Sequence, residues 1–232
     1  MTELLVEASG LHTYYGSHHI LHGVRFTIAR GEAIGLMGRN GMGKTTLLRT
    51  ILGLVRAREG TVRIRGREAT REPPYRIARE GIAYVPEGRG IFPTLSVQEN
   101  LVMAARSGPW TLQRVLETFP RLAERLHHGG HQLSGGEQQM LTIGRALMTN
   151  PELLILDEAT EGLAPRIARD IWAIVQRVRK SGIAAVIVDK NFKALSAVTD
   201  RSVILVKGRV AYEGSTAELA ARPDIRRAHL GV

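Results

Sequence analysis

The sequence predicts one α/β domain in which a mostly helical segment interrupts an alternating pattern of strands and helices. Three observations carry this prediction: short apolar runs between turn residues toward both ends of the chain, a glycine-rich loop between a strand and a helix, and a helical pattern from residue 96 to residue 150. A length of 232 residues suits a single domain, and 44% hydrophobic with 23% charged residues excludes a disordered chain.

The first third of the chain alternates short apolar runs with turn residues, which is typical of strands, several of them antiparallel. These strands are predicted at 4–8, 24–28, 33–37 and 61–64. A helix is predicted over 45–54, where helix-forming residues follow the glycine-rich loop.

The middle of the chain is predicted to be helical. Ser96 and Glu99 have the spacing of a capping box, which opens a helix reaching Ala105. Two more helices are predicted, over 111–119 and 121–127.

The last third returns to an α/β pattern. The apolar run at 153–156 fits a parallel strand covered on both faces. An amphipathic helix follows over 165–180, and a second buried strand lies at 183–188. A hairpin is predicted from 203–206 and 210–212.

The chain is strongly basic, with 32 Lys and Arg against 22 Asp and Glu and a net charge of +10. The densest stretch, 56–80, holds eight Arg and four Glu. Such a surplus could bind nucleic acid, an anionic membrane or acidic small molecules. Because no nucleic-acid motif accompanies the charge, the favoured interpretation is a solvated arginine-rich surface without a nucleic-acid partner.

Other features narrow the class of protein. With no cysteine, the chain has no disulfide framework and no thiolate metal site. The longest apolar run, 183–188, is too short to span a bilayer, and the first ten residues lack the basic start of a signal peptide. We therefore expect a cytoplasmic protein.

Residues 38–45, GRNGMGKT, form a complete phosphate-loop motif between an apolar strand and a helix. Glycines let successive backbone N–H groups face one anion, and the helix N-terminus adds a favourable dipole. Lys44 is expected to reach the β- and γ-phosphates of a nucleotide, and the Thr45 hydroxyl to ligate Mg²⁺. The alternative is a plain glycine-rich turn. The predicted nucleotide-binding residues of this segment are Gly38, Asn40, Gly41, Met42, Gly43, Lys44, Thr45 and Thr46.

Two further motifs accompany the phosphate loop. The strand LLILDE ends on Asp157, which we expect on the magnesium side, and on Glu158, which we expect to polarise water; alone, two such acids are a common solvated turn. In LSGGEQ, Ser134 and Glu137 again form a capping box. The two glycines in the first helical turn lower helix stability by roughly 1 kcal/mol each. Their presence is explained if another group must approach the backbone closely.

These three motifs, in this order, resemble an ATP-binding-cassette (ABC) ATPase, and the resemblance runs from Leu5 to Val210. It implies a P-loop NTPase core of the RecA-like type, with an antiparallel β subdomain and an inserted helical subdomain. The expected organisation is a single ABC ATPase domain over 1–232. Residues 1–88 and 149–232 would form the nucleotide-binding core, and 89–148 the helical subdomain.

The resemblance also implies roles for individual residues. Two cassettes of this family sandwich two ATP molecules, so Ser134, Gly135 and Gly136 are expected at the nucleotide of a second subunit. Tyr15 resembles the aromatic residue that stacks on adenine, although it could be a core tyrosine. The loop 161–165 resembles the segment that runs between the subunits.

Two positions depart from the family pattern. Glu87 stands where glutamine is usual and is expected to contact the metal or a metal-bound water. Lys190 stands at the position of the switch histidine, so it is a candidate catalytic residue. A lysine supplies a point charge without the hydrogen-bond geometry of histidine, and the alternative is an exposed lysine after a strand.

The segment YVPEGRGIFPTLSVQENL and the later EGLAP most resemble the short ATPase subunits of branched-chain amino-acid importers. The resemblance implies ATP hydrolysis with ATP and Mg²⁺ as cofactors, on the cytoplasmic side of the inner membrane. It implies a second ABC ATPase subunit, two transmembrane permease subunits docked near residues 90–101, and indirectly an extracytoplasmic solute-binding protein.

Three alternatives remain open. Urea and short-chain amide importers use near-identical cassettes. Exporter ATPases, such as those of lipopolysaccharide transport, share all the motifs. A soluble cassette acting on nucleic acid or ribosomes would explain the charge, but such proteins generally carry two fused cassettes or long coiled-coil insertions.

Overall fold

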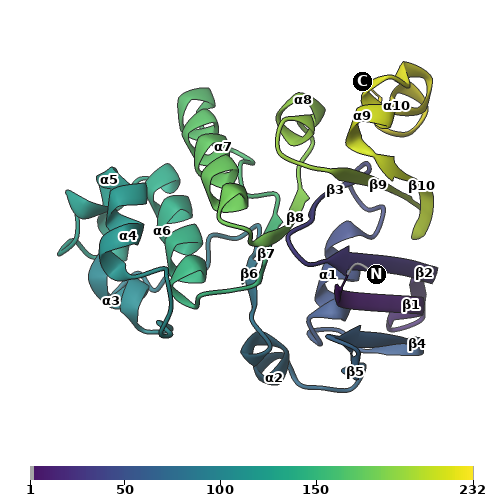
Figure 1. Ribbon diagram of the computed structural model, residues 1–232, viewed down its shortest axis with the longest axis horizontal. Helices are drawn as coiled ribbons and strands as arrows, with labels where there is room; N and C mark the ends of the chain where they lie inside the picture. The colour runs from purple at the N-terminus through teal and green to yellow at the C-terminus, as the bar shows by residue number, and fades with distance from the viewer. Residues whose placement is uncertain (1–2, 232) are drawn as a thin grey trace.

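The computed structural model describes residues 3–231, which fold around two β-sheets (Figure 1). The smaller sheet is antiparallel, with strand order β2-β1-β4-β5. Its strands are β1 (Leu4–Tyr15), β2 (His18–Ala29), β4 (Ala57–Ile64) and β5 (Arg67–Glu68).

The larger sheet has six strands in the order β10-β9-β3-β8-β7-β6. All neighbours in it are parallel except the edge strand β10, which pairs antiparallel with β9. The carboxyl ends of its five parallel strands therefore lie along one edge, where ligands bind in folds of this kind. The strands are β3 (Ala33–Met37), β6 (Ile82–Val85), β7 (Leu153–Asp157), β8 (Ala184–Val188), β9 (Arg201–Val206) and β10 (Arg209–Ser215).

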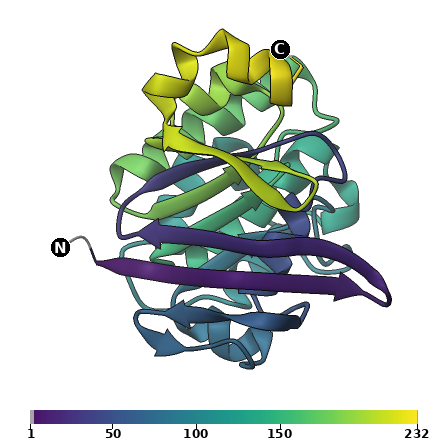
Figure 2. The ribbon, with the colours of Figure 1, turned by 90° about the vertical axis from the view of Figure 1, so that its right-hand side faces the viewer.

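The helices occupy distinct places around these sheets. In Figure 1 the helices α3 to α6 gather on one side and the antiparallel sheet on the other, with the six-stranded sheet between them. Figure 2 shows the long β1–β2 hairpin crossing the face opposite those helices. The helices are α1 (Lys44–Ile51), α2 (Pro74–Arg79), α3 (Val97–Val102), α4 (Leu112–Thr118), α5 (Pro120–Ala123), α6 (Gly135–Met148), α7 (Pro165–Lys180), α8 (Phe192–Ser196), α9 (Thr216–Ala220) and α10 (Pro223–His229), with a 3-10 turn at Gly130–Gln132.

Two buried clusters hold the layers together. One joins Leu47 and Leu48 of α1 to Val6 of the antiparallel sheet and Val186 of the six-stranded sheet, so α1 is packed between the sheets. The other joins the opposite face of the six-stranded sheet to α6, α7 and the smaller helices. Burial on both faces explains why the central strands are almost entirely apolar. The predicted α/β fold class is confirmed.

Some predicted elements differ in extent. The strand predicted at 4–8 continues to Tyr15. The chain bulges at residues 9–10, and from Leu11 onward it pairs with β2 again. The helix predicted over 121–127 ends at Ala123. Residues 124–127 form turns instead. The carbonyls of Leu126 and His128 accept hydrogen bonds from the first backbone N–H groups of α3.

Several short elements had no prediction, namely β5, β6, α2, α8, α9 and α10. Elements of this length carry too few residues to show a period, and neighbouring strands and helices stabilise them. Among the helices within residues 3–231, none combines the length and the apolar composition that crossing a bilayer requires.

Candidate functional site

The phosphate loop connects β3 to α1 at the carboxyl edge of the six-stranded sheet. Gly38 has a φ of 138°, and a Cβ there would come within 2.4 Å of the Leu205 carbonyl oxygen. Gly43 has a φ of 100° and precedes α1 without any side-chain cap. The first N–H groups of α1 therefore have no side-chain acceptor, which leaves them available to an anion.

Lys44 is buried within this loop, with 5% of its surface exposed. Its ammonium donates to the Gly38 carbonyl at 2.9 Å and to the Arg39 carbonyl at 3.2 Å. The Nζ also lies 3.6 Å from Oε1 of Glu158. A cation thus lies within the glycine-rich loop that precedes the N-terminus of α1, an arrangement suited to phosphate.

Asp157 is the last residue of β7 and is fully buried. Its Oδ1 accepts from the Thr45 hydroxyl at 3.3 Å, and its Oδ2 accepts from the Tyr84 hydroxyl at 3.0 Å. Burial raises the pKa of this carboxyl, while the hydrogen bonds from Tyr84 and Thr45 oppose the rise.

Tyr84 was not among the predicted site residues. The feature that could have identified it is a tyrosine within an apolar run, because a buried phenol usually finds a hydrogen-bond partner. Burial, followed by the charge of Asp157, raises the pKa of this phenol, so it stays protonated and donates. Hydrogen bonding to the Tyr15 hydroxyl, followed by that to Tyr84, raises the pKa of the Arg49 guanidinium.

Glu158 follows β7 with a φ of 52°, in the left-handed region that non-glycine residues rarely adopt. Its backbone N–H donates to the Val188 carbonyl at 2.9 Å, which fixes it beside β8. Burial and a hydrogen bond with Glu161 raise the pKa of Glu158 to about 7. A carboxyl with a pKa near neutrality can both hold and accept a proton, as general-base chemistry requires.

Lys190 follows β8 and faces these acids. Its Nζ lies 2.6 Å from Oε1 of Glu161 and 4.0 Å from Oε2 of Glu158. Its side chain is 52% exposed, and hydrogen bonding to Glu161 raises its pKa. Glu161 was not among the predicted site residues; it is the first residue of the loop 161–165, which resembles the segment that runs between the subunits.

The site offers oxygen ligands of the kind that Mg²⁺ takes. Carboxylate oxygens of Glu87, Glu158 and Glu161 lie within 4.8 Å of one another, and the Thr45 hydroxyl lies against Asp157. Carboxylates and a hydroxyl beside a phosphate-binding loop suit Mg²⁺, which binds through one or two carboxylates plus substrate phosphates. The residues present therefore fit the metal.

A cavity of about 350 Å³ lies over the phosphate loop. Tyr15, 42% exposed at the end of β1, does not line it, while Ile20 does. Gly38 and Met42 do not line it either; the Met42 carbonyl instead accepts from Gly208 N–H in the β9–β10 turn. The lining residues are Ile20, Asn40, Gly41, Gly43, Lys44, Thr45, Thr46, Glu87 and Glu158.

The signature residues lie outside this cavity, at the start of α6. Ser134 and Glu137 form the predicted capping box, with the Ser134 hydroxyl donating to Glu137 Oε2 at 2.7 Å. Two side chains of the same chain come close to the glycine backbone here. A Cβ on Gly135 would come within 2.7 Å of the Arg89 guanidinium, and a Cβ on Gly136 within 2.5 Å of the Ile167 side chain.

Comparison with known proteins agrees with these motifs. Residues 21–161 match the ABC transporter family. The chain is 42% identical over 227 residues to the high-affinity branched-chain amino acid transport ATP-binding protein BraG of Pseudomonas aeruginosa, covering 94% of this chain and 96% of BraG. It is 33% identical to the lipopolysaccharide export system ATP-binding protein LptB of Acidithiobacillus ferridurans, covering 100% of this chain and 98% of LptB.

Solved structures show the same fold. A nucleotide-free ATP-binding cassette from an ABC transporter superposes with a TM-score of 0.82 at 25% identity, covering 96% of this chain and 97% of that one. The ADP conformation of another ATP-binding cassette of an ABC transporter superposes with a TM-score of 0.80 at 25% identity, covering 97% of each chain.

Proposed function

Because this chain belongs to the ABC transporter family, and is an ATPase whose hydrolysis is coupled to transport, we propose that it powers uptake of branched-chain or related amino acids. The observation that carries the proposal is its 42% identity to BraG along nearly the whole of both chains. Lipopolysaccharide export is the second candidate, favoured by the 33% identity to LptB.

In the proposed reaction, the phosphate loop binds the phosphates of ATP. Lys44 donates to the phosphates in place of the Gly38 and Arg39 carbonyls that it now contacts. Mg²⁺, held by Thr45, Asp157 and Glu87, would neutralise phosphate charge during transfer. Tyr15 would stack on the adenine from the end of β1.

Glu158 is proposed to orient the attacking water and to accept its proton. Its Oε1 lies 3.6 Å from the Nζ of Lys44, which supports a role beside the terminal phosphate, and its raised pKa suits a general base. Lys190 contacts both Glu158 and Glu161, so we assign it attraction for phosphate and support of these acids rather than proton transfer.

Ser134, Gly135 and Gly136 are proposed to contact ATP held by a second ABC ATPase subunit. Their absence from the cavity over the phosphate loop supports this assignment, because one chain does not bring both groups together. ATP would therefore hold two subunits together.

The permease subunits are proposed to dock on the helical side of the molecule, near residues 90–101. Large apolar side chains are exposed in and beside this segment: Phe92 is 45% exposed and Met103 is 50% exposed. Contiguous exposed apolar patches mark interaction surfaces, and we propose that these side chains contribute to one. The chain would then sit peripherally on the cytoplasmic side of the inner membrane, with the extracytoplasmic solute-binding protein acting through the permeases.

The proposal is tested by purifying the tagged chain from solubilised membranes and reconstituting the complex in liposomes. We expect permease subunits to co-purify, and ATPase activity to rise when the solute-binding protein is loaded with a branched-chain amino acid. The Lys44→Ala complex is the matched control and should show no stimulation. Co-purification with lipopolysaccharide-export permeases, or stimulation by another solute alone, would contradict the amino-acid assignment.

A further inference from the structure

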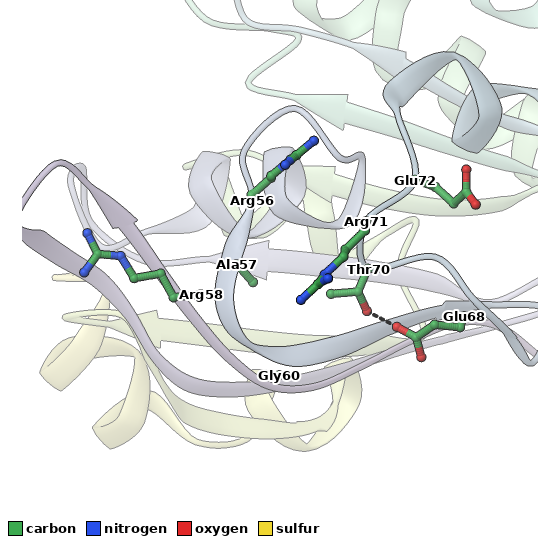
Figure 3. A pocket seen from close by; sticks show the side chains of 8 residues that line it. All are labelled: Arg56, Ala57, Arg58, Gly60, Glu68, Thr70, Arg71 and Glu72. Carbon is green, nitrogen blue, oxygen red and sulfur yellow. Dashed lines mark hydrogen bonds between the residues drawn. The ribbon is translucent and has the colours of Figure 1, made fainter.

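A second cavity, of about 630 Å³, lies in the antiparallel sheet between β4 and the segment that follows β5 (Figure 3). It shares no lining residue with the cavity over the phosphate loop. Its lining residues all belong to the arginine-rich stretch 56–80, for which a solvated surface was predicted. The charged and polar lining side chains are Arg56, Arg58, Glu68, Thr70, Arg71 and Glu72.

The two acidic residues of the cavity already have partners. Glu68 accepts from the Thr70 hydroxyl and lies 3.9 Å from the guanidinium of Arg63, while Glu72 pairs with Arg76 at 3.0 Å. Both partner arginines lie outside the cavity lining. Each acid of the lining therefore has an arginine partner that lies outside the lining.

The three arginines of the cavity have no such compensation. Within residues 3–231, no ion pair involves Arg56, Arg58 or Arg71. Figure 3 shows Arg56 and Arg71 coming from two facing segments, with Arg58 extending toward the β1–β2 hairpin. There Arg58 donates to the Gly16 carbonyl at 2.7 Å and lies 4.1 Å from the ring centre of Tyr14.

We propose that this cavity binds a soluble small molecule carrying several phosphoryl groups, at a site separate from the proposed ATP site. Guanidinium groups present a planar set of donors that matches phosphate oxygens, and those of Arg56 and Arg71 lack a carboxylate partner among the described residues. The volume suits a small molecule. Its lining holds no aromatic residue on which a nucleic-acid base could stack, so the site is suited to phosphoryl groups rather than to bases.

The site is tested with inorganic tripolyphosphate as the probe, by calorimetry in a buffer without divalent cations. The chain is first saturated with ADP, so that the phosphate loop is filled. We expect one additional tripolyphosphate per chain. Arg56→Gln with Arg71→Gln should weaken its binding at least about tenfold, a scale suited to losing two charge-assisted contacts. Arg58 is left unchanged because it also holds the β1–β2 hairpin.

The matched control is Arg25→Gln with Arg67→Gln, which removes the same charge from exposed positions outside the cavity. This control should change tripolyphosphate affinity by less than about twofold, the scale expected of solvent-screened charges that do not contact the ligand. Absence of tripolyphosphate binding to the ADP-saturated chain, or an equal loss of affinity in both double variants, would overturn the proposal. So would binding to phosphatidylglycerol vesicles that needs Arg56 and Arg71 without any binding of free tripolyphosphate.

Discussion

The molecule contains two glycine-rich helix starts that differ in what they leave available. At α1, Gly43 provides no side-chain cap, and the preceding loop surrounds the buried ammonium of Lys44. At α6, Ser134 and Glu137 satisfy each other in a capping box. The first helix start lines the cavity over the phosphate loop, and the second lies outside that cavity.

This difference shows that two glycine-rich helix starts can differ in how many hydrogen-bond donors they leave free for a ligand. The phosphate loop offers free backbone N–H groups and a positive charge within one chain. At α6, the Ser134 hydroxyl already donates to Glu137, so it must leave that partner before it can donate to a phosphate. A capping interaction of this kind is worth about 1 kcal/mol, which ATP binding can exceed.

The largest expected effect belongs to the phosphate loop. Lys44→Ala removes the ammonium that bonds to the Gly38 and Arg39 carbonyls, and should abolish ATP binding to the isolated chain in calorimetry. The exposed Lys193 serves as the control, because Lys193→Ala removes the same charge from the surface. Unchanged affinity in Lys44→Ala would contradict the assigned nucleotide site.

Removing the proposed base should separate binding from turnover. Glu158→Gln keeps size and hydrogen bonding but loses the carboxylate that accepts a proton. We expect ATP binding to persist, while turnover in the complete complex falls by about 100-fold or more. In the same variant, ATP should raise the dimer fraction measured by light scattering. Turnover near the unchanged level would show that another group acts as base.

A bulky side chain at the start of α6 tests whether this helix start contacts ATP on a second subunit. Ser134→Arg should leave ATP affinity of the isolated chain unchanged, since Ser134 lies outside the cavity over the phosphate loop. In the assembled transporter, turnover should fall into the range expected for Glu158→Gln. Intact ATPase activity in that complex would refute a site shared between subunits.

A smaller effect is expected from the hydroxyl that bonds to Asp157. Tyr84→Phe removes a 3.0 Å hydrogen bond to Oδ2 and leaves the ring. The Mg²⁺ affinity of the ATP-bound chain should fall on the order of tenfold, as is usual for groups that orient metal ligands. ATP affinity without Mg²⁺, measured by calorimetry, should stay the same. A parallel loss without Mg²⁺ would indicate a purely structural role.

The smallest effect is expected at Lys190. Its pairs with Glu158 and Glu161 are partly exposed, and such pairs contribute little. Steady-state ATPase rates of Lys190→Ala in the complete complex should fall by less than about threefold, a loss matched to one weak pair. A loss as large as that of Glu158→Gln would show that lysine performs the whole role of the family's histidine.

The sequence by itself determined the fold class and the three linked motifs. The phosphate loop, the strand ending on Asp157 and the capping box at Ser134 are local patterns, because each needs only neighbouring residues to define its geometry. The amphipathic helix predicted over 165–180 has those bounds in the structure, since its apolar period covers four turns.

Only the tertiary structure decided which distant residues meet. Tyr84 reaches Asp157 across 73 positions, Thr45 reaches it across 112, and Lys190 reaches Glu161 across 29. Likewise, Arg56 and Arg71 line one cavity because the chain turns back after β5. Contacts of this kind depend on strand order and on packing between the sheets, and residue spacing along one sequence carries no record of either.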